Sequence, residues 1–114
     1  LTGTIPSQLG EQLQSSLTRL SLSYNQLEGS IPSELGLIKT MELFHVSHND
    51  NLTGRFPSEL GTWSRNRVTI DIRETNVTGS IPGQFCFDPH KYVVLANCTQ
   101  MECCGMADVA AWSP

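Results

Sequence analysis

Residues 27–36 read LEGSIPSELG, and the chain of 114 residues repeats nearly this phrase four times. The other copies are LTGTIPSQLG at 1–10, LTGRFPSELG at 52–61 and VTGSIPGQFC at 77–86. Successive copies begin 26, 25 and 25 residues apart. A fixed period of this length is typical of a solenoid, in which each repeat forms one coil and buries its apolar side against neighbouring coils.

A second half-repeat lies between the phrases and carries apolar residues at alternate positions. Its clearest copy is LTRLSLSYNQL at 17–27. Alternation with a period of two predicts a short strand with one buried face, so stacked coils form a parallel sheet with one strand per coil. The alternating apolar residues are Leu20 and Leu22, Phe44 and Val46, and Ile70 and Ile72.

Polar residues follow each predicted strand. Asn25 and Asn49 follow the first two strands, and an amide there can satisfy backbone groups where the chain leaves the sheet. Thr75 occupies the third position, where its shorter hydroxyl is predicted to interrupt this ladder of amides.

The repeated phrase itself predicts a bend followed by a short helical turn. Its glycine relaxes the backbone, its proline holds the preceding residue extended, and the Ser-x-x-Leu that follows starts a 3₁₀ or α turn. We expect the serine side chains to cap these turns. The serines concerned are Ser7, Ser33 and Ser58.

The composite L-x-x-L-x-L-x-x-N-x-L-x-G-x-I-P-x-x-L-G resembles the plant-type leucine-rich repeat of receptor-like kinases, receptor-like proteins and polygalacturonase inhibitors. The resemblance covers residues 1–98. It implies an α/β solenoid, a right-handed coil of about three to four turns with a parallel sheet on the concave face and short 3₁₀ or α turns on the convex side. It also implies an extracellular or cell-surface protein. Related algal proteins carry the same repeat and sometimes a Cys-rich end.

Residues 86–114 hold all four cysteines and are predicted to form a disulfide-closed C-terminal cap in an oxidising compartment. A bridge between the adjacent Cys103 and Cys104 would be strained, so Cys86 and Cys98 are each expected to take one of them, in either order. A zinc site is the alternative to disulfides, but the usual C-x-x-C spacing of zinc ligands is missing. The three N-x-S/T sequons, at Asn51, Asn76 and Asn97, favour disulfides and predict glycosylation in the secretory pathway.

Composition and motifs exclude several classes of function. A net charge of −4 offers no basic surface for nucleic acid, and no stretch approaches the roughly 18 apolar residues of a membrane span. The serines, cysteines and histidines lack a catalytic motif, and the repeat explains the glycines without a phosphate-binding loop. We therefore expect a protein that is not an enzyme and has no cofactor.

Candidate contact residues are those predicted to point outward from the concave strands. They suit a protein, peptide or glycan ligand, although a solvated sheet face shows the same polarity. Ser21, His45, Asp71 and Leu95 are expected to form one row across the strands. The candidates are Arg19, Tyr24, His45, His48, Asp71, Arg73 and Glu74.

A metal site at His45, His48 and Asp71 is disfavoured, because residues three apart on one strand point to opposite faces unless the strand ends between them. We expect instead a cross-strand charge pair between Asp71 and His45.

The sequence thus predicts a non-catalytic recognition module of a receptor or secreted binding protein. One alternative is a secreted inhibitor of cell-wall glycosidases, which the family resemblance implies. Another is a structural or assembly module. In that case the uncapped face around Leu1, Ile5 and Leu9 either supports preceding repeats or meets a partner.

Overall fold

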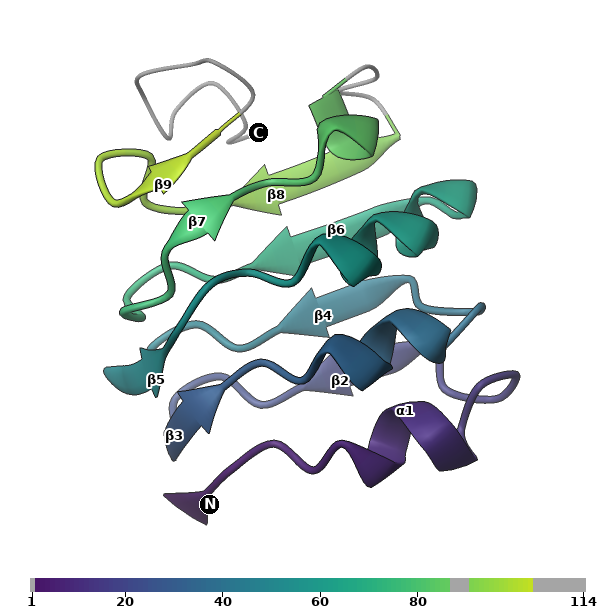
Figure 1. The fold of residues 1–114 in the computed structure, drawn as a ribbon, viewed down its shortest axis with the longest axis horizontal. Coiled ribbons are helices and arrows are strands. Elements are labelled where there is room, and N and C mark those ends of the chain that lie inside the picture. The colour runs from purple at the N-terminus through teal and green to yellow at the C-terminus, as the bar shows by residue number, and fades with distance from the viewer. Residues whose placement is uncertain (1, 87–90, 104–114) are drawn as a thin grey trace.

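A computed structural model describes residues 2–86 and 91–103, and in it the chain winds into coils stacked one upon another (Figure 1). Each full coil places one strand in the main sheet, a second short strand on the way out, and a helical turn on the opposite side. The elements, with η for a 3₁₀ helix, are β1 (Thr2–Gly3), α1 (Gln8–Gln12), β2 (Arg19–Ser21), β3 (Gln26–Ser30), η1 (Ser33–Leu37), β4 (Leu43–His45), β5 (Asn51–Thr53), η2 (Ser58–Arg65), β6 (Val68–Asp71), β7 (Gly79–Ser80), η3 (Gly83–Cys86), β8 (Tyr92–Leu95) and β9 (Met101–Glu102).

The main sheet has the order β2-β4-β6-β8, and its strands are all parallel. The pairing aligns Ser21 with His45, His45 with Asp71, and Asp71 with Leu95. The predicted row across the strands is therefore confirmed. So is the leucine-rich repeat architecture, because a parallel sheet lies on one side of the coils and short helical turns lie on the other (Figure 1).

A second line of short strands runs where each coil leaves the main sheet. β1, β3 and β5 pair in parallel, and β7 pairs with β9. The glycine of the repeated phrase bends the chain here with a left-handed backbone, at φ 78° in Gly29 and 80° in Gly54. A residue with a Cβ would be strained in this conformation, which explains why the phrase keeps glycine.

The core fills the space between the main sheet and the turns. Phe44 from β4 and Trp63 from η2 are both completely buried, and their rings lie 5.2 Å apart between centroids. The Trp63 indole Nε1 donates a 3.0 Å hydrogen bond to the carbonyl of Leu35 in the preceding coil. This bond satisfies a polar group that would otherwise be costly to bury.

The helical turns approach one another too closely for side chains at one position. A Cβ built on Gly36 would lie 2.6 Å from the carbonyl oxygen of Glu59, and one on Gly61 would lie 2.8 Å from the Gln84 side chain. In each case the obstacle belongs to the next coil. The expectation of serine caps is wrong, because none of the first three turns has a capping hydrogen bond from a side chain.

Asn49 holds two coils together at the end of the main sheet. Its Nδ2 donates to the carbonyls of Leu22 and Val46, and its Oδ1 accepts from the backbone N–H of Leu27 at 3.1 Å. The Thr75 hydroxyl, at the equivalent place in the next coil, donates to the carbonyl of Ile72 at 2.8 Å and accepts from the backbone N–H of Val77 at 3.4 Å, both within its own coil. The predicted weak point of the ladder is therefore present.

The C-terminal cap compensates for Thr75. Gln100 Nε2 donates to the carbonyls of Thr75 and Val77, both at 2.9 Å. A disulfide between Cys98 and Cys103 closes the loop that carries Gln100. Of the two pairings that the sequence left open, this bond selects one. Cys86 is also disulfide-bonded, while Cys104 lies outside the described residues.

Candidate ligand-binding face

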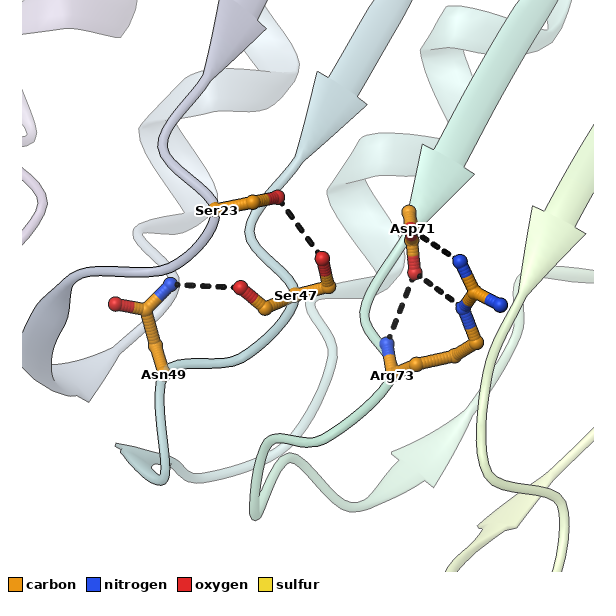
Figure 2. Close-up of polar contacts among 5 residues, drawn as sticks. All are labelled: Ser23, Ser47, Asn49, Asp71 and Arg73. Carbon is orange, nitrogen blue, oxygen red and sulfur yellow. Dashed lines mark hydrogen bonds and ion pairs between the residues drawn. The ribbon is translucent and has the colours of Figure 1, made fainter.

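The exposed side of the main sheet carries polar residues in rows that run from coil to coil. Beside the row of Ser21, His45 and Asp71 lies a second row, in which the Ser47 hydroxyl donates to that of Ser23 at 2.9 Å. Figure 2 shows this hydrogen bond, with Asn49 bound to the carbonyl of Ser47 below it. This hydrogen bond between coils holds the Ser23 and Ser47 side chains in fixed positions.

Asp71 and Arg73 form a two-pronged ion pair on the third coil (Figure 2). Arg73 Nε donates to Oδ1 at 3.0 Å and Nη2 donates to Oδ2 at 2.9 Å, while the Arg73 backbone N–H also donates to Oδ1. Asp71 is buried, whereas the Arg73 side chain is 47% exposed. The carboxylate thus holds the guanidinium in one orientation on the face of the sheet.

The ion pair sets the charge state of both partners. Burial raises the pKa of Asp71, but hydrogen bonds from Arg73, its positive charge and the nearby His45 outweigh that effect and hold the pKa below its ordinary value. The hydrogen bond to Asp71 raises the pKa of Arg73 above its ordinary value.

His45 and Asp71 are neighbours in the sheet, as expected, and His45 contributes to the lowered pKa of Asp71, but the two residues form no direct ion pair among the described residues. The Asp71 carboxylate is bound by Arg73 instead, and His45 Nε2 is buried without a hydrogen-bond partner among the described residues. The row of Ser21, His45 and Asp71 therefore lacks the imidazole–carboxylate hydrogen bond that a catalytic triad uses.

A third row lies just past the strand ends, where Tyr24, His48 and Glu74 have left-handed backbones with φ of 60°, 59° and 57°. The Tyr24 and His48 rings stack with their centroids 4.1 Å apart and their planes 9° from parallel. Tyr24 is 77% exposed. Because β4 ends at His45, the geometry that placed the two histidines on opposite faces of one strand does not apply.

Two hollows flank this third row. One, of about 350 Å³, lies toward the cap, and the other, of about 390 Å³, lies toward the first coil. Asp50 lines both of them. The first is lined by Asp50, Arg73, Glu74, Thr75, Asn76, Ala96, Asn97 and Gln100. The second is lined by Thr2, Asn25, Gln26, Glu28, His48, Asp50 and Asn51.

The structure therefore brings most of the predicted contact residues together and separates one. Tyr24 stacks on His48, and Arg73 lies with Glu74 in the first hollow, but Arg19 lies at the start of β2, away from the strand ends. Sequence reasoning missed Asp50 and Gln100. Asp50 belongs to a short insertion before Leu52, which was the available signal, whereas nothing in the repeat pattern indicated that Gln100 folds back onto the third coil.

The three sequon asparagines are exposed and lie beside the same hollows. Asn76 and Asn97 line the first hollow and Asn51 lines the second. Their use as glycosylation sites stays a prediction. Within residues 2–86 and 91–103, no three His, Cys, Asp or Glu residues are grouped as ligands for a metal ion.

Comparison with known proteins also finds leucine-rich repeats in this chain. The family model of the leucine-rich repeat matches residues 16–38. The receptor-like protein Cf-9 homolog of Solanum lycopersicum is 32% identical over 85 residues, which is 75% of this chain and 10% of that relative. The chain thus spans about a tenth of the length of the curated relative it matches.

Solved structures also resemble the chain. The BIR3–SERK2 complex from Arabidopsis thaliana contains a chain that is 32% identical with a TM-score of 0.66, covering 85% of this chain and 50% of that one. The plant peptide hormone receptor RGFR1, solved in complex with RGF2, is 26% identical with a TM-score of 0.71, covering 83% of this chain and 15% of that one. Among the described residues, no helix has the length and apolar character needed to cross a membrane.

Proposed function

From the similarity of this chain to plant leucine-rich repeat proteins, we propose that it is an extracellular recognition module that binds a peptide or protein on its main-sheet face. It performs no chemistry of its own in this proposal. Two similar structures support the kind of partner, since one is a peptide hormone receptor solved with RGF2 and the other is a complex of two proteins.

One observation carries the proposal: the exposed side chains of the sheet face are held in place before any ligand arrives. Asp71 fixes Arg73 through two side-chain hydrogen bonds, and Tyr24 stacks on His48. Arginine and tyrosine are among the residues most enriched at the energetic centres of interfaces. Ordering them in the free protein reduces the entropy lost on binding.

The test is selection of ligands from a displayed library of random peptides, followed by calorimetry with the selected sequences. We expect dissociation constants to rise at least tenfold for Tyr24→Ala and His48→Ala, and to stay within about twofold for Glu34→Ala on the convex turn η1. Peptides that bind Tyr24→Ala and Glu34→Ala equally well would contradict the proposal. So would inhibition of a cell-wall glycosidase by a protein that selects no peptide.

A further inference from the structure

The row of Tyr24, His48 and Glu74 uses a backbone conformation that is unfavourable for these residues. All three have φ near +60°, where Cβ crowds the backbone and where Gly, Asn or Asp is the less costly choice. The same position in three successive coils therefore carries a large side chain despite local strain. Strain repeated in this way indicates that the side chains themselves matter.

The conformation directs the Tyr24 and His48 side chains to the rim of the sheet. Tyr24 is the most exposed large apolar residue of the described chain, and its ring is supported from one side by His48 at 4.1 Å. A stacked pair loses little further freedom when a ligand packs against its edges. Rigid, exposed aromatic area of this kind suits a proline or an aromatic ring of a partner.

The edge on which this row lies is acidic. Glu28 and Asp50 line the hollow toward the first coil, and Asp50 and Glu74 line the hollow toward the cap. No hydrogen bond or ion pair reaches these three carboxylates from anywhere in residues 2–86 and 91–103. Arg73 is the basic residue of the hollow toward the cap, and its charge is already matched by Asp71.

Two other basic residues lie away from this edge. Lys39 and Arg65 line a separate hollow of about 180 Å³ between the helical turns, together with Gln14. The three carboxylates of the strand-end edge outnumber its one arginine, which is also paired with Asp71, so the edge carries a net negative charge. A positively charged partner is the complement of such a surface.

We propose that this edge, formed by Tyr24, His48, Glu74, Glu28 and Asp50, docks an extended peptide segment bearing two basic side chains with a ring residue between them. The proposal rests on the proposed function and adds the charge and spacing of its ligand. The hollows lie about two coils apart, roughly 10 Å at 4.8 Å per coil. A peptide in the extended polyproline II conformation covers that distance in about three residues, and because this helix has three residues per turn, its basic residues stand three positions apart on one side.

The test uses a blocked synthetic peptide, acetyl-GSKPYKSG-amide, and its neutral counterpart, acetyl-GSQPYQSG-amide. Calorimetry at low salt is expected to show binding of the basic peptide and at least tenfold weaker binding of the neutral one. Binding of the basic peptide should weaken as salt is raised, because exposed charges are screened. Equal affinity for the two peptides would overturn the proposal, and so would no detectable binding of the basic one.

A matched pair of variants locates the site. Asp50→Asn with Glu74→Gln removes two carboxylates from the edge, and Glu34→Gln with Glu59→Gln removes two from the convex turns. All four residues are exposed, so both variants are expected to fold, which urea unfolding verifies. The first variant should bind the basic peptide at least tenfold more weakly and the second within twofold of the original chain. Equal losses in both would show unspecific attraction and sink the proposal.

The results of these experiments distinguish failure of this inference from failure of the proposed function. If the peptide binds but only Arg19→Ala and His45→Ala weaken it, the ligand lies on the middle of the sheet. The proposal of docking at the edge is then wrong, and the proposed recognition by the sheet face is retained. If library selection yields no peptide at all, the proposed function fails whatever the charge of the edge.

Discussion

Asp71 is a buried carboxylate on the face of the main sheet, and its partner Arg73 lies only two positions along the chain. Residues i and i+2 share one face where the backbone is extended, so the pairing with Arg73 could have been predicted. The expected partner was His45, because neighbouring strands align these residues. The sequence cannot rank the two, since both lie within reach and only side-chain geometry decides between them.

Replacing Asp71 with asparagine tests the ion pair through pH. In the folded protein the pKa of Asp71 is lowered, so ionised Asp71 stabilises the fold above the ordinary aspartate pKa of about 4. That contribution is lost as the pH falls through the lower pKa of the folded state. Asp71→Asn should therefore reduce the free energy of unfolding by about 1–2 kcal/mol at pH 7 and by much less at pH 3.

Urea unfolding of both proteins at the two pH values provides the measurement. Glu74→Gln is the matched control, because this neighbouring carboxylate has no hydrogen bond among the described residues. If Asp71→Asn lowered the free energy of unfolding by the same amount at pH 3 as at pH 7, the charge of Asp71 would play no part in stability.

The helical turns explain a feature of the repeat that composition alone does not. Gly10, Gly36 and Gly61 occupy the last position of the first three phrases, and each would bring a Cβ against the following coil. The fourth phrase places Cys86 there, at the end of η3. The sequence showed where the repetition stops, but the steric reason needed the distance between turns.

Gly36→Ala measures this close approach. The new Cβ would lie 2.6 Å from the Glu59 carbonyl oxygen, so the turns must move apart. We expect a loss of about 1–3 kcal/mol in the free energy of unfolding, as for other overpacked sites. Gly83→Ala is the control, since nothing lies within 4 Å of a Cβ at that glycine. Equal stability of the two variants in urea would refute the steric argument.

The cap loop between Cys98 and Cys103 is the element that replaces the missing amide of the third coil. Replacing both cysteines with alanine should lower the free energy of unfolding by about 2 kcal/mol, the loop entropy expected for so short a bridge. The hydrogen bonds of Gln100 to the carbonyls of Thr75 and Val77 should weaken with it.

Urea unfolding gives the loss, and amide exchange across residues 97–101 shows whether the loop opens. The matched control is Gln100→Ala with both cysteines kept, which removes the hydrogen bonds alone. If the cysteine variant were no less stable than the original chain, the cap would not depend on its disulfide.

At the scale of the whole molecule, stability comes from contacts between neighbouring coils. The apolar residues of the middle coils, such as Phe44 and Val46, are completely buried, whereas Leu17, Leu20 and Leu22 of the first strand are only partly buried. In a stack of this kind, each coil is as stable as the neighbours that cover it. The protection of backbone amides against hydrogen exchange should therefore differ from coil to coil.

Hydrogen exchange offers a direct comparison of equivalent amides. Leu22 donates to the carbonyl of His45 and Val46 donates to that of Asp71, so both amides are hydrogen-bonded across the same sheet. We expect the Leu22 amide to exchange at least tenfold faster than the Val46 amide under native conditions, because its coil frays first. Equal rates, both set by global unfolding, would show that the coils melt as one unit.

Most of the fold could be predicted from the sequence, because period and alternation belong to every copy of the repeat. The candidate site could be predicted only in part. Tyr24, His48 and Glu74 were named because they were predicted to point outward from the concave strands, but their shared left-handed backbone appears only when the coils are built. The cap contributes Asn97 and Gln100 to the same region through contacts that no repeat encodes.

The close approach at Gly10, Gly36 and Gly61 also has a consequence for how such a gene can lengthen. Each of these glycines makes room for the coil that follows, so a duplicated unit of about 25 residues is tolerated wherever the copy before it ends in glycine. A duplication placed after Cys86 would push a new turn against a side chain that is already committed to a disulfide. Duplication upstream of the cap therefore preserves the close approach of the turns, whereas duplication at Cys86 would have to change it.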